Sequence, residues 1–340
     1  MKVQIGNIAI GDGEKIAVQS MCNTKTTDID GSIQQILQLE KYGCDIVRLS
    51  VPDKESAVAL KEVVKAVHIP VVADIHFDYR LAISSCDSGA SKIRINPGNI
   101  GDESKVKYVA DYLRERNIPI RIGVNGGSLE KQYQHLPLSE AMCKSALGHI
   151  ALLEKFNFYN TIISVKSSDV RTSVEAYRLL KKACDYPLHV GITEAGVYER
   201  GVIKSAIGIG SLLLDGIGDT IRVSLSDEPY KEVVIAKEIL NSLGLGDPHV
   251  EVISCPTCAR TNIDVSGLAN MVVNATKDIK KSAKIAVMGC VVNGPGEASS
   301  CDFGVAGGKD KSAIFAKGKV LKVVENDKII EEILNFINSL

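Results

Sequence analysis

The cysteines with the spacing of metal ligands lie in the last third of the chain. Cys255 and Cys258 form a Cys-x2-Cys turn, Cys290 follows within Gly289-Cys-Val-Val-Asn-Gly-Pro-Gly-Glu297, and Cys301 comes last. This arrangement is compatible with zinc, an iron–sulfur cluster or a redox dithiol. Zinc ribbons repeat the Cys-x2-Cys pair, which occurs once here, and a redox dithiol needs no third cysteine. The pattern therefore favours a [4Fe-4S] cluster, with Cys301 or Glu297 as the fourth ligand.

The other five cysteines are expected to be structural. Cys44, Cys86, Cys143 and Cys184 occupy apolar positions of the sequence pattern, where a free cysteine behaves as a small hydrophobic residue. Cys22 follows the first expected strand, and packing is favoured over a role in a cavity. The total of nine is odd, and the N-terminus carries no secretory or transit signal. We therefore expect free thiols in a reducing compartment, the cytoplasm.

A second group of chemically competent residues follows a series of β-branched runs. Cations recur there, and residues two apart, such as Arg94 and Asn96, share one face of a strand. Five clustered cations repel one another unless an anion joins them, and guanidinium groups match phosphate oxygens, so the ligand expected is a di- or polyphosphate. The two carboxylates of the group either pair with arginine or hold a substrate hydroxyl and relay a proton, and we favour the second role for Glu194. The group comprises Arg48, Asp74, His76, Arg94, Arg121, Asn125, Lys166, Glu194, Arg222 and Ser224.

These residues need a scaffold that brings the ends of many strands together. Helix-like stretches with apolar residues at helical spacing separate the runs, and strict alternation of strand and helix implies parallel strands. Eight such units fit a (β/α)8 barrel, with a doubly wound open sheet as the competing fold. The segments 3–10 and 16–18, on either side of Gly11-Asp12-Gly13, are expected to form a hairpin that could plug the bottom. The predicted strands are 17–21, 45–51, 70–74, 92–96, 119–125, 160–166, 188–193 and 220–225.

The pattern changes after Gly244-Leu245-Gly246-Asp247-Pro248, which predicts a domain boundary. We expect a barrel domain over 1–245 and a smaller α+β domain over 250–340 that carries the cluster. The second domain is expected to contain strands at 250–254 and 285–292, a helix at 265–279, a hairpin ending in 319–324 and a final helix at 328–337. The barrel helix expected at 228–243 returns from the mouth to the bottom, so a short linker cannot bring the second domain to its own barrel mouth. We therefore expect a head-to-tail homodimer.

Several long motifs resemble one family. Those in the barrel are 18–24 (VQSMCNT), 72–80 (VADIHFDYR), 94–101 (RINPGNIG), 121–125 (RIGVN), 189–196 (HVGITEAG) and 222–224 (RVS). Those in the second domain are 255–258 (CPTC) and 289–298 (GCVVNGPGEA). The chain resembles the 4-hydroxy-3-methylbut-2-en-1-yl diphosphate synthases of the methylerythritol phosphate route to isoprenoids, in their two-domain bacterial form.

The resemblance implies reductive ring opening of 2-C-methyl-D-erythritol 2,4-cyclodiphosphate by two electrons, with loss of water. It implies a [4Fe-4S] cluster on Cys255, Cys258, Cys290 and Glu297, which favours Glu297 over Cys301. Diphosphate binding falls on the strand-end group above, with Asp74 and Glu194 near the sugar carbons. A flavodoxin or ferredoxin is implied as electron donor, and a head-to-tail homodimer as the assembly. Cys22 stands where the family usually has threonine, and Cys301 is outside the family pattern.

Two interpretations from other classes compete with this one. The first is a zinc-stabilised barrel lyase acting on a sugar phosphate. The second is a non-catalytic iron–sulfur sensor that binds nucleic acid, which the balance of 40 Lys+Arg against 41 Asp+Glu disfavours. The same charge balance means that nucleic acid is not an expected partner. A membrane is not expected either, because no apolar run approaches the ~20 residues of a membrane span.

Overall fold

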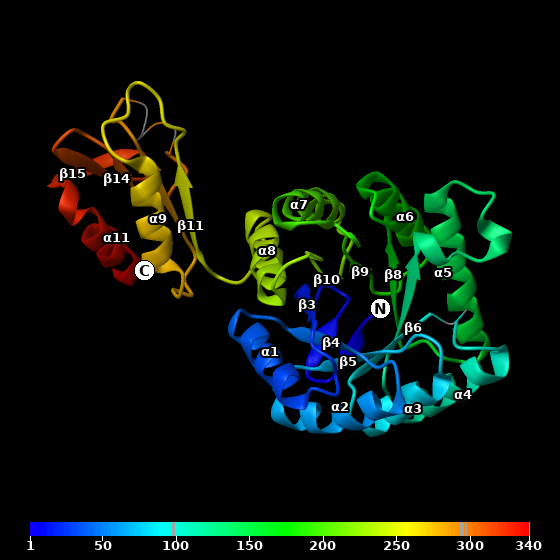
Figure 1. The fold of residues 1–340 in the computed structure, drawn as a ribbon. Helices are drawn as coiled ribbons and strands as arrows, with labels where there is room; N and C mark the ends of the chain where they lie inside the picture. The colour runs from blue at the N-terminus through cyan, green and yellow to red at the C-terminus, as the bar shows by residue number, and fades with distance from the viewer. Residues whose placement is uncertain (97–98, 293–295, 297, 340) are drawn as a thin grey trace. The chain divides into compact units, whose positions relative to one another are not determined.

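The computed structural model describes residues 1–96, 99–292, 296 and 298–339. The chain forms two compact units, Met1–Leu245 and Gly246–Leu340, which are described separately (Figure 1). Within the described residues, no helix has the length and apolar character needed to cross a bilayer.

The first unit is the predicted (β/α)8 barrel. Its eight strands lie in the order β8-β7-β6-β5-β4-β3-β10-β9, and every pairing is parallel. A parallel bridge between Ile163 and Leu188 joins the two ends of this order and closes the barrel. The strands are β3 (Ala17–Met21), β4 (Ile46–Ser50), β5 (Val71–Asp74), β6 (Lys92–Ile95), β7 (Ile120–Asn125), β8 (Thr161–Lys166), β9 (His189–Val190) and β10 (Thr220–Ile221).

In the described part of the unit, eight helices follow these strands, and they lie around the outside of the barrel (Figure 1). Aspartate side chains begin five of them, because a carboxylate at the N-cap accepts hydrogen bonds from backbone N–H groups of the first turn; these are Asp28, Asp53, Asp78, Asp102 and Asp169. The helices are α1 (Ile29–Lys41), α2 (Lys54–Ala66), α3 (Tyr79–Asp87), α4 (Glu103–Glu115), α5 (Leu138–Lys155), α6 (Val170–Ala183), α7 (Tyr198–Leu214) and α8 (Pro229–Ser242). Two short 3-10 turns, η1 (Gly126–Ser128) and η2 (Lys131–Tyr133), precede α5.

The N-terminal hairpin differs from the prediction in the position of its turn. Strands β1 (Val3–Ile5) and β2 (Ile8–Ile10) pair with each other, so the turn lies at Gly6-Asn7 and not at Gly11-Asp12-Gly13. The hairpin does pack against the amino ends of the barrel strands. Its apolar side chains Val3, Ile5 and Ile10 form one buried cluster with Ala17, Ile46, Val72 and Ile162.

Two barrel strands, β9 and β10, end several residues earlier than the sequence indicated. Strand β9 ends at Val190 and β10 at Ile221, although the β-branched runs continue to Thr193 and Leu225. Arg222 and Ser224 therefore follow β10 and do not belong to it, so their two-residue spacing does not place them on one face of a strand. They still reach the carboxyl end of the barrel, where the loops begin.

The second unit is an α+β fold. Its sheet has the order β11-β12-β13-β14-β15. The pairings among the first three strands are parallel, and those of β14 with β13 and with β15 are antiparallel. The elements are β11 (Val250–Ser254), α9 (Val265–Thr276), β12 (Ala283–Met288), β13 (Phe303–Ala306), β14 (Lys311–Ala316), β15 (Lys319–Glu325), η3 (Asn326–Lys328) and α11 (Ile329–Ser339). Apolar residues of α9, α11 and the central strands share one core.

Candidate functional site

A cavity of about 250 Å³ lies at the carboxyl end of the barrel strands. It brings together nine of the ten residues predicted for substrate and catalysis, which are Arg48, Asp74, His76, Arg94, Arg121, Asn125, Lys166, Arg222 and Ser224. The tenth, Glu194, lines an adjoining cavity of about 460 Å³. The two cavities share Asn125, Lys166 and Thr193, so they lie next to each other.

Strand register explains how these side chains meet. Arg94 on β6 lies level with Asp74 on β5 and with Arg121 on β7, and Asn125 at the end of β7 lies level with Lys166. Gly123 makes room for the Arg94 side chain, since a Cβ at that position would lie 2.7 Å from Arg94 Nε. Parallel strands in register thus place cations from successive strands side by side at the mouth.

Asp74 is the carboxylate at the centre of the arginines. Its Oδ1 accepts a hydrogen bond from Arg94 Nη1 at 3.0 Å, and its Oδ2 lies 3.6 Å from Arg48 Nε. Burial raises the pKa of Asp74, but Arg48, Arg94 and Arg121 outweigh it and hold that pKa below its usual value. The carboxylate therefore stays ionised at neutral pH and orders two of the predicted phosphate-binding side chains.

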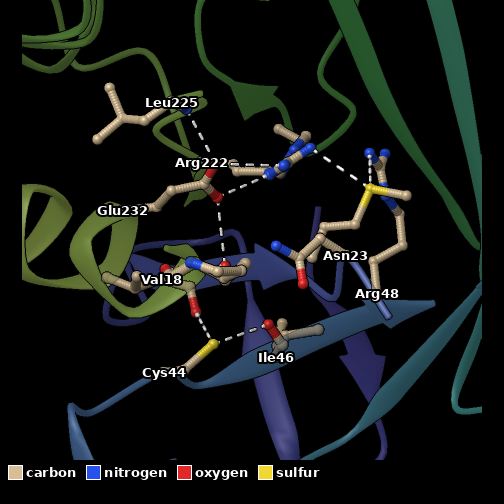
Figure 2. Close-up of polar contacts among 12 residues, drawn as sticks. Val18, Asn23, Cys44, Ile46, Arg48, Arg222, Leu225 and Glu232 are labelled. Atoms are coloured by element: carbon tan, nitrogen blue, oxygen red, sulfur yellow. Dashed lines mark hydrogen bonds and ion pairs between the residues drawn. The ribbon is translucent and has the colours of Figure 1, made fainter. Parts of the chain in front are cut away.

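Arg222 is held by a carboxylate that the sequence analysis did not identify. Its Nε and Nη2 lie 3.3 Å and 3.4 Å from the two carboxylate oxygens of Glu232 on α8. Glu232 also accepts from the backbone N–H of Leu225 and from the hydroxyl of Ser20 (Figure 2). The sulfur of Met21 lies between Arg48 and Arg222, 2.8 Å from Arg48 Nη2 and 3.6 Å from Arg222 Nη1. Both guanidinium groups are thereby fixed at the cavity wall.

Arg121 is the most buried of the cations at the mouth, with 2% of its surface exposed. Its Nε and Nη1 are buried without a hydrogen-bond partner in the described residues, as is Nε of Arg94. Burial lowers the pKa of Arg121 well below its usual value, and the neighbouring Arg48 and Arg94 lower it further. Unpartnered donors of this kind are costly unless a ligand completes them. They are the donors that an anion entering the cavity would satisfy.

Glu194 differs from Asp74 in its surroundings. It is exposed, lies in the loop after β9 and has a backbone φ of +50°, a left-handed conformation that costs energy for a residue with a side chain. Local strain of this kind is retained where the surrounding structure fixes a side chain for a purpose. The position fits a group that acts on a substrate at the entrance of the cavity.

The cysteine site lies at the carboxyl ends of β11 and β12. These strands pair in parallel with Ser254 opposite Val287, so Cys255 and Cys290 follow neighbouring strand ends. The backbone N–H of Gly289 donates to Cys255 Sγ at 3.2 Å, and hydrogen bonds from the backbone and side chain of Arg260 lower the pKa of Cys258. The lowered pKa of Cys258 favours its thiolate, the form that binds iron. The donor chemistry of the three cysteines therefore fits an iron–sulfur cluster.

The fourth predicted ligand, Glu297, lies outside the described residues. In the part of the chain that the structure describes, no group of three or more His, Cys, Asp or Glu side chains is close enough together to hold a metal ion. Cys301, the competing fourth ligand, is fully buried in an apolar cluster with Met288 and Phe315, and burial raises its pKa. This environment is that of a packing residue.

Two family models cover nearly all of the chain. The GcpE TIM-barrel domain matches residues 1–237, and the GcpE protein C-terminal domain matches residues 251–339. The chain belongs to the GcpE family.

Two curated relatives of this chain carry the name 4-hydroxy-3-methylbut-2-en-1-yl diphosphate synthase (flavodoxin). The protein of Caldanaerobacter subterraneus subsp. tengcongensis is 55% identical over 342 residues, which cover 100% of this chain and 96% of the relative. The protein of Clostridium perfringens is 50% identical over 342 residues, covering 100% of this chain and 98% of the relative. The resemblance stated from the sequence motifs is confirmed.

Solved structures similar to this GcpE chain agree on the barrel. Yersinia pestis dihydropteroate synthase superposes with a TM-score of 0.55 at 14% identity, over 72% of this chain and 98% of that one. The N-acetylneuraminic acid synthetase of Leptospira borgpetersenii gives 0.52 at 12% identity, over 82% of this chain and 98% of that one. At these identities the likeness shows the fold alone.

Three buried charged or basic residues of the barrel, Glu232, Lys92 and His189, were not predicted from the sequence. Glu232 lies in the first turn of α8, where a carboxylate resembles an ordinary charge of a helix N-terminus. Lys92 and His189 begin their strands, away from the carboxyl ends where the chemistry of a barrel is expected. The sequence pattern that could have identified Lys92 and His189 is a basic residue inside an apolar strand. Such a residue is buried together with its strand, and both are fully buried here.

Proposed function

We propose that this chain converts 2-C-methyl-D-erythritol 2,4-cyclodiphosphate into 4-hydroxy-3-methylbut-2-enyl diphosphate by reductive ring opening and dehydration with two electrons. The name carried by its full-length relatives supports this reaction. Family membership gives no support to the zinc-stabilised lyase. The observation that carries the proposal is the cationic cavity with unpartnered arginine donors at the barrel mouth.

The charge balance of the cavity matches a cyclic diphosphate. Five cations, Arg48, Arg94, Arg121, Lys166 and Arg222, meet two carboxylates, Asp74 and Glu232, so positive charge remains in excess. A diphosphate brings the missing negative charge and oxygen acceptors for the guanidinium groups. His76, Asn125 and Ser224 line the same wall and supply further donors to phosphate or hydroxyl oxygens.

Two carboxylates are proposed to act on the sugar portion. Asp74, ionised and bound to Arg48 and Arg94, orders the phosphate-binding side chains and faces the sugar carbons. Glu194, at the entrance, moves the proton that accompanies loss of water, because its exposed carboxyl can exchange protons with solvent. The barrel thus binds and orients the substrate before electrons arrive.

The resident cofactor in this proposal is a [4Fe-4S] cluster held by Cys255, Cys258, Cys290 and Glu297. When bound, it supplies the two electrons one at a time. The N–H group of Gly289 donates to Cys255 Sγ, and the Arg260 contacts lower the pKa of Cys258 toward the thiolate form needed for ligation. All nine cysteines are free, which accords with a cytoplasmic enzyme.

The assembly proposed is a head-to-tail homodimer with a flavodoxin or ferredoxin as electron donor. Helix α8 has 14 residues, and at 1.5 Å per residue it spans about 21 Å from the mouth toward the bottom of the barrel. The chain therefore leaves the barrel at the end opposite the cavity. A second copy would then supply the cysteines that serve each mouth, and the relatives' printed name favours flavodoxin as donor.

The test is an anaerobic assay of the full chain, purified with its iron, using the cyclic diphosphate and an artificial reductant. The expected product is 4-hydroxy-3-methylbut-2-enyl diphosphate, with brown absorbance that is lost in Cys290→Ala. A colourless, zinc-containing protein that cleaves a sugar phosphate without reductant would replace this proposal by the lyase.

A further inference from the structure

A chain of hydrogen bonds beneath the cavity involves a residue to which the proposed reaction assigns no role. Lys166 ends β8 with its Nζ 3.0 Å from Nε2 of His189, and Nδ1 of His189 lies 2.7 Å from Oγ1 of Thr220. His189 and Thr220 are fully buried, and 9% of Lys166 is exposed. His189 and Thr220 lie opposite each other in the register of β9 and β10, so three neighbouring strands fix the chain.

The donors and acceptors of this chain can be assigned from chemistry. An ammonium group has three donors and no acceptor, so Nε2 of His189 must accept from Lys166. Nδ1 then carries the ring proton and donates to the Thr220 hydroxyl. The backbone of His189 is held as well, because the hydroxyl of Tyr177 donates to the carbonyl oxygen of His189 at 2.6 Å.

The surroundings keep this imidazole neutral. Burial lowers the pKa of His189 well below its usual value, and the cations Lys166, Arg121, Lys92 and Arg48 lower it further. Burial also lowers the pKa of Lys166 well below its usual value, and repulsion adds to it. The charged groups that act on Lys166 are Arg121, Arg222 and Arg48, which lower its pKa, and Glu232, which raises it.

Space around the Lys166 amine is restricted as well. A Cβ at Gly191 would lie 3.0 Å from Lys166 Nζ and would collide with the carbonyl oxygen of Arg222. The amine is thus confined between β9 and the cavity it lines.

We propose that His189 is a positioning residue, whose neutral imidazole, locked by Thr220, directs the Lys166 ammonium group into the cavity as the proton-dependent contact to a diphosphate. This inference rests on the proposed function and adds a residue and a proton linkage to it. In molecules where Lys166 has lost its proton, binding of the anion is accompanied by uptake of one proton from solvent. That proton forms an N–H bond at Lys166 Nζ, and no other covalent bond of the protein changes. Binding should therefore weaken as pH rises through the pKa of Lys166.

The test measures binding of inorganic diphosphate to the iron-loaded full chain by calorimetry, from neutral to alkaline pH. His189→Leu removes the acceptor, which leaves the ammonium less stabilised among arginines, so the alkaline loss of binding should move to lower pH. A hydrogen bond to a charged group is worth ~1.5–3 kcal/mol, so binding at neutral pH should weaken at least about tenfold. The ligand's own ionisation is common to all variants and cancels in the comparison.

Two variants separate positioning from packing. His189→Gln can place an amide oxygen near the position of Nε2 and should restore most of the binding and the alkaline limit. Tyr177→Phe removes a buried hydrogen bond to the His189 backbone, so it should lower the melting temperature without moving the pH profile. If His189→Leu does not fold, Thr220→Val, which unlocks the ring, should shift the profile in the same direction.

The proposal is overturned if the binding profiles of His189→Leu and Thr220→Val superimpose on that of the wild type. It is also overturned if His189→Gln behaves as His189→Leu. A wild-type chain that binds diphosphate but leaves the cyclic diphosphate unconverted contradicts the proposed reaction alone. A chain that converts it while the His189 variants bind unchanged contradicts only the role of His189.

Discussion

Arg121 and Arg222 line the same cavity, but we expect Arg121 to destabilise the fold and Arg222 to stabilise it. Arg222 is paired with Glu232 through both carboxylate oxygens, whereas two nitrogen atoms of Arg121 are buried without a partner in the described residues. A buried charge without compensation destabilises a fold, while breaking a buried pair leaves its partner uncompensated. Each arginine should therefore respond differently to removal of its charge.

Arg121→Met should weaken binding of inorganic diphosphate by about 10- to 100-fold, the worth of a charge-assisted contact. It should leave the melting temperature unchanged or higher, because an unpartnered buried cation is removed. Arg222→Met is the matched variant and should lower the melting temperature, since Glu232 stays buried without its cation. Calorimetry of binding and of unfolding checks both; equal destabilisation by the two substitutions would contradict this account.

Asp74 gives a prediction about pH. Arg48, Arg94 and Arg121 hold its pKa below the usual value despite burial, so its carboxylate loses charge only below about pH 3.8, the unperturbed value. A step in kcat/KM on the acid side near neutrality therefore belongs to another group. Asp74→Asn should lower kcat/KM at least about tenfold, through disorder of Arg48 and Arg94, without moving that acid step. An acid step that disappears in Asp74→Asn would show that Asp74 itself titrates there.

At the scale of elements, periodicity and turn signals identified all eight barrel strands, because parallel strands buried on both sides produce continuous β-branched runs. The ends of β9 and β10 were wrong, since the apolar run continues into loop residues that are buried for other reasons. The hairpin turn was also misplaced, because two turn signals compete within a short N-terminal segment. Glu232 was missed because strand ends alone were searched. Local patterns thus identify an element, whereas tertiary packing decides where it stops.

The cysteines of the second unit give a prediction about elements. Cys290 follows β12, the strand that pairs with β11 just before Cys255, while Cys301 is packed in an apolar cluster. Cys301→Ala should therefore retain iron and sulfide and cost about 1 kcal/mol in the free energy of unfolding, as small buried truncations do. Cys290→Ala should lose the brown absorbance. Loss of iron from Cys301→Ala together with its retention in Cys290→Ala would reverse the assignment.

At the scale of the whole molecule, the proposed homodimer predicts complementation. Arg94→Ala disables the barrel cavity and Cys290→Ala disables the cysteine site, so each homodimer should be inactive. Coexpression of the two variants forms mixed dimers that contain one intact barrel and one intact cysteine site on different chains. Activity should return to a fraction of the wild-type rate when these dimers are isolated through two affinity tags. Absence of rescue in verified mixed dimers would argue for sites completed within one chain.

The hairpin at the amino end of the barrel has a kinetic consequence. Because Val3, Ile5 and Ile10 seal that end with apolar contacts, the hollow lined by the arginines has its opening on the mouth side. In the proposed reaction, substrate entry and product exit then share one route, and the same cations would bind the diphosphate of both molecules. Product must then leave before the next substrate can bind, so product at high concentration should compete with substrate and slow turnover.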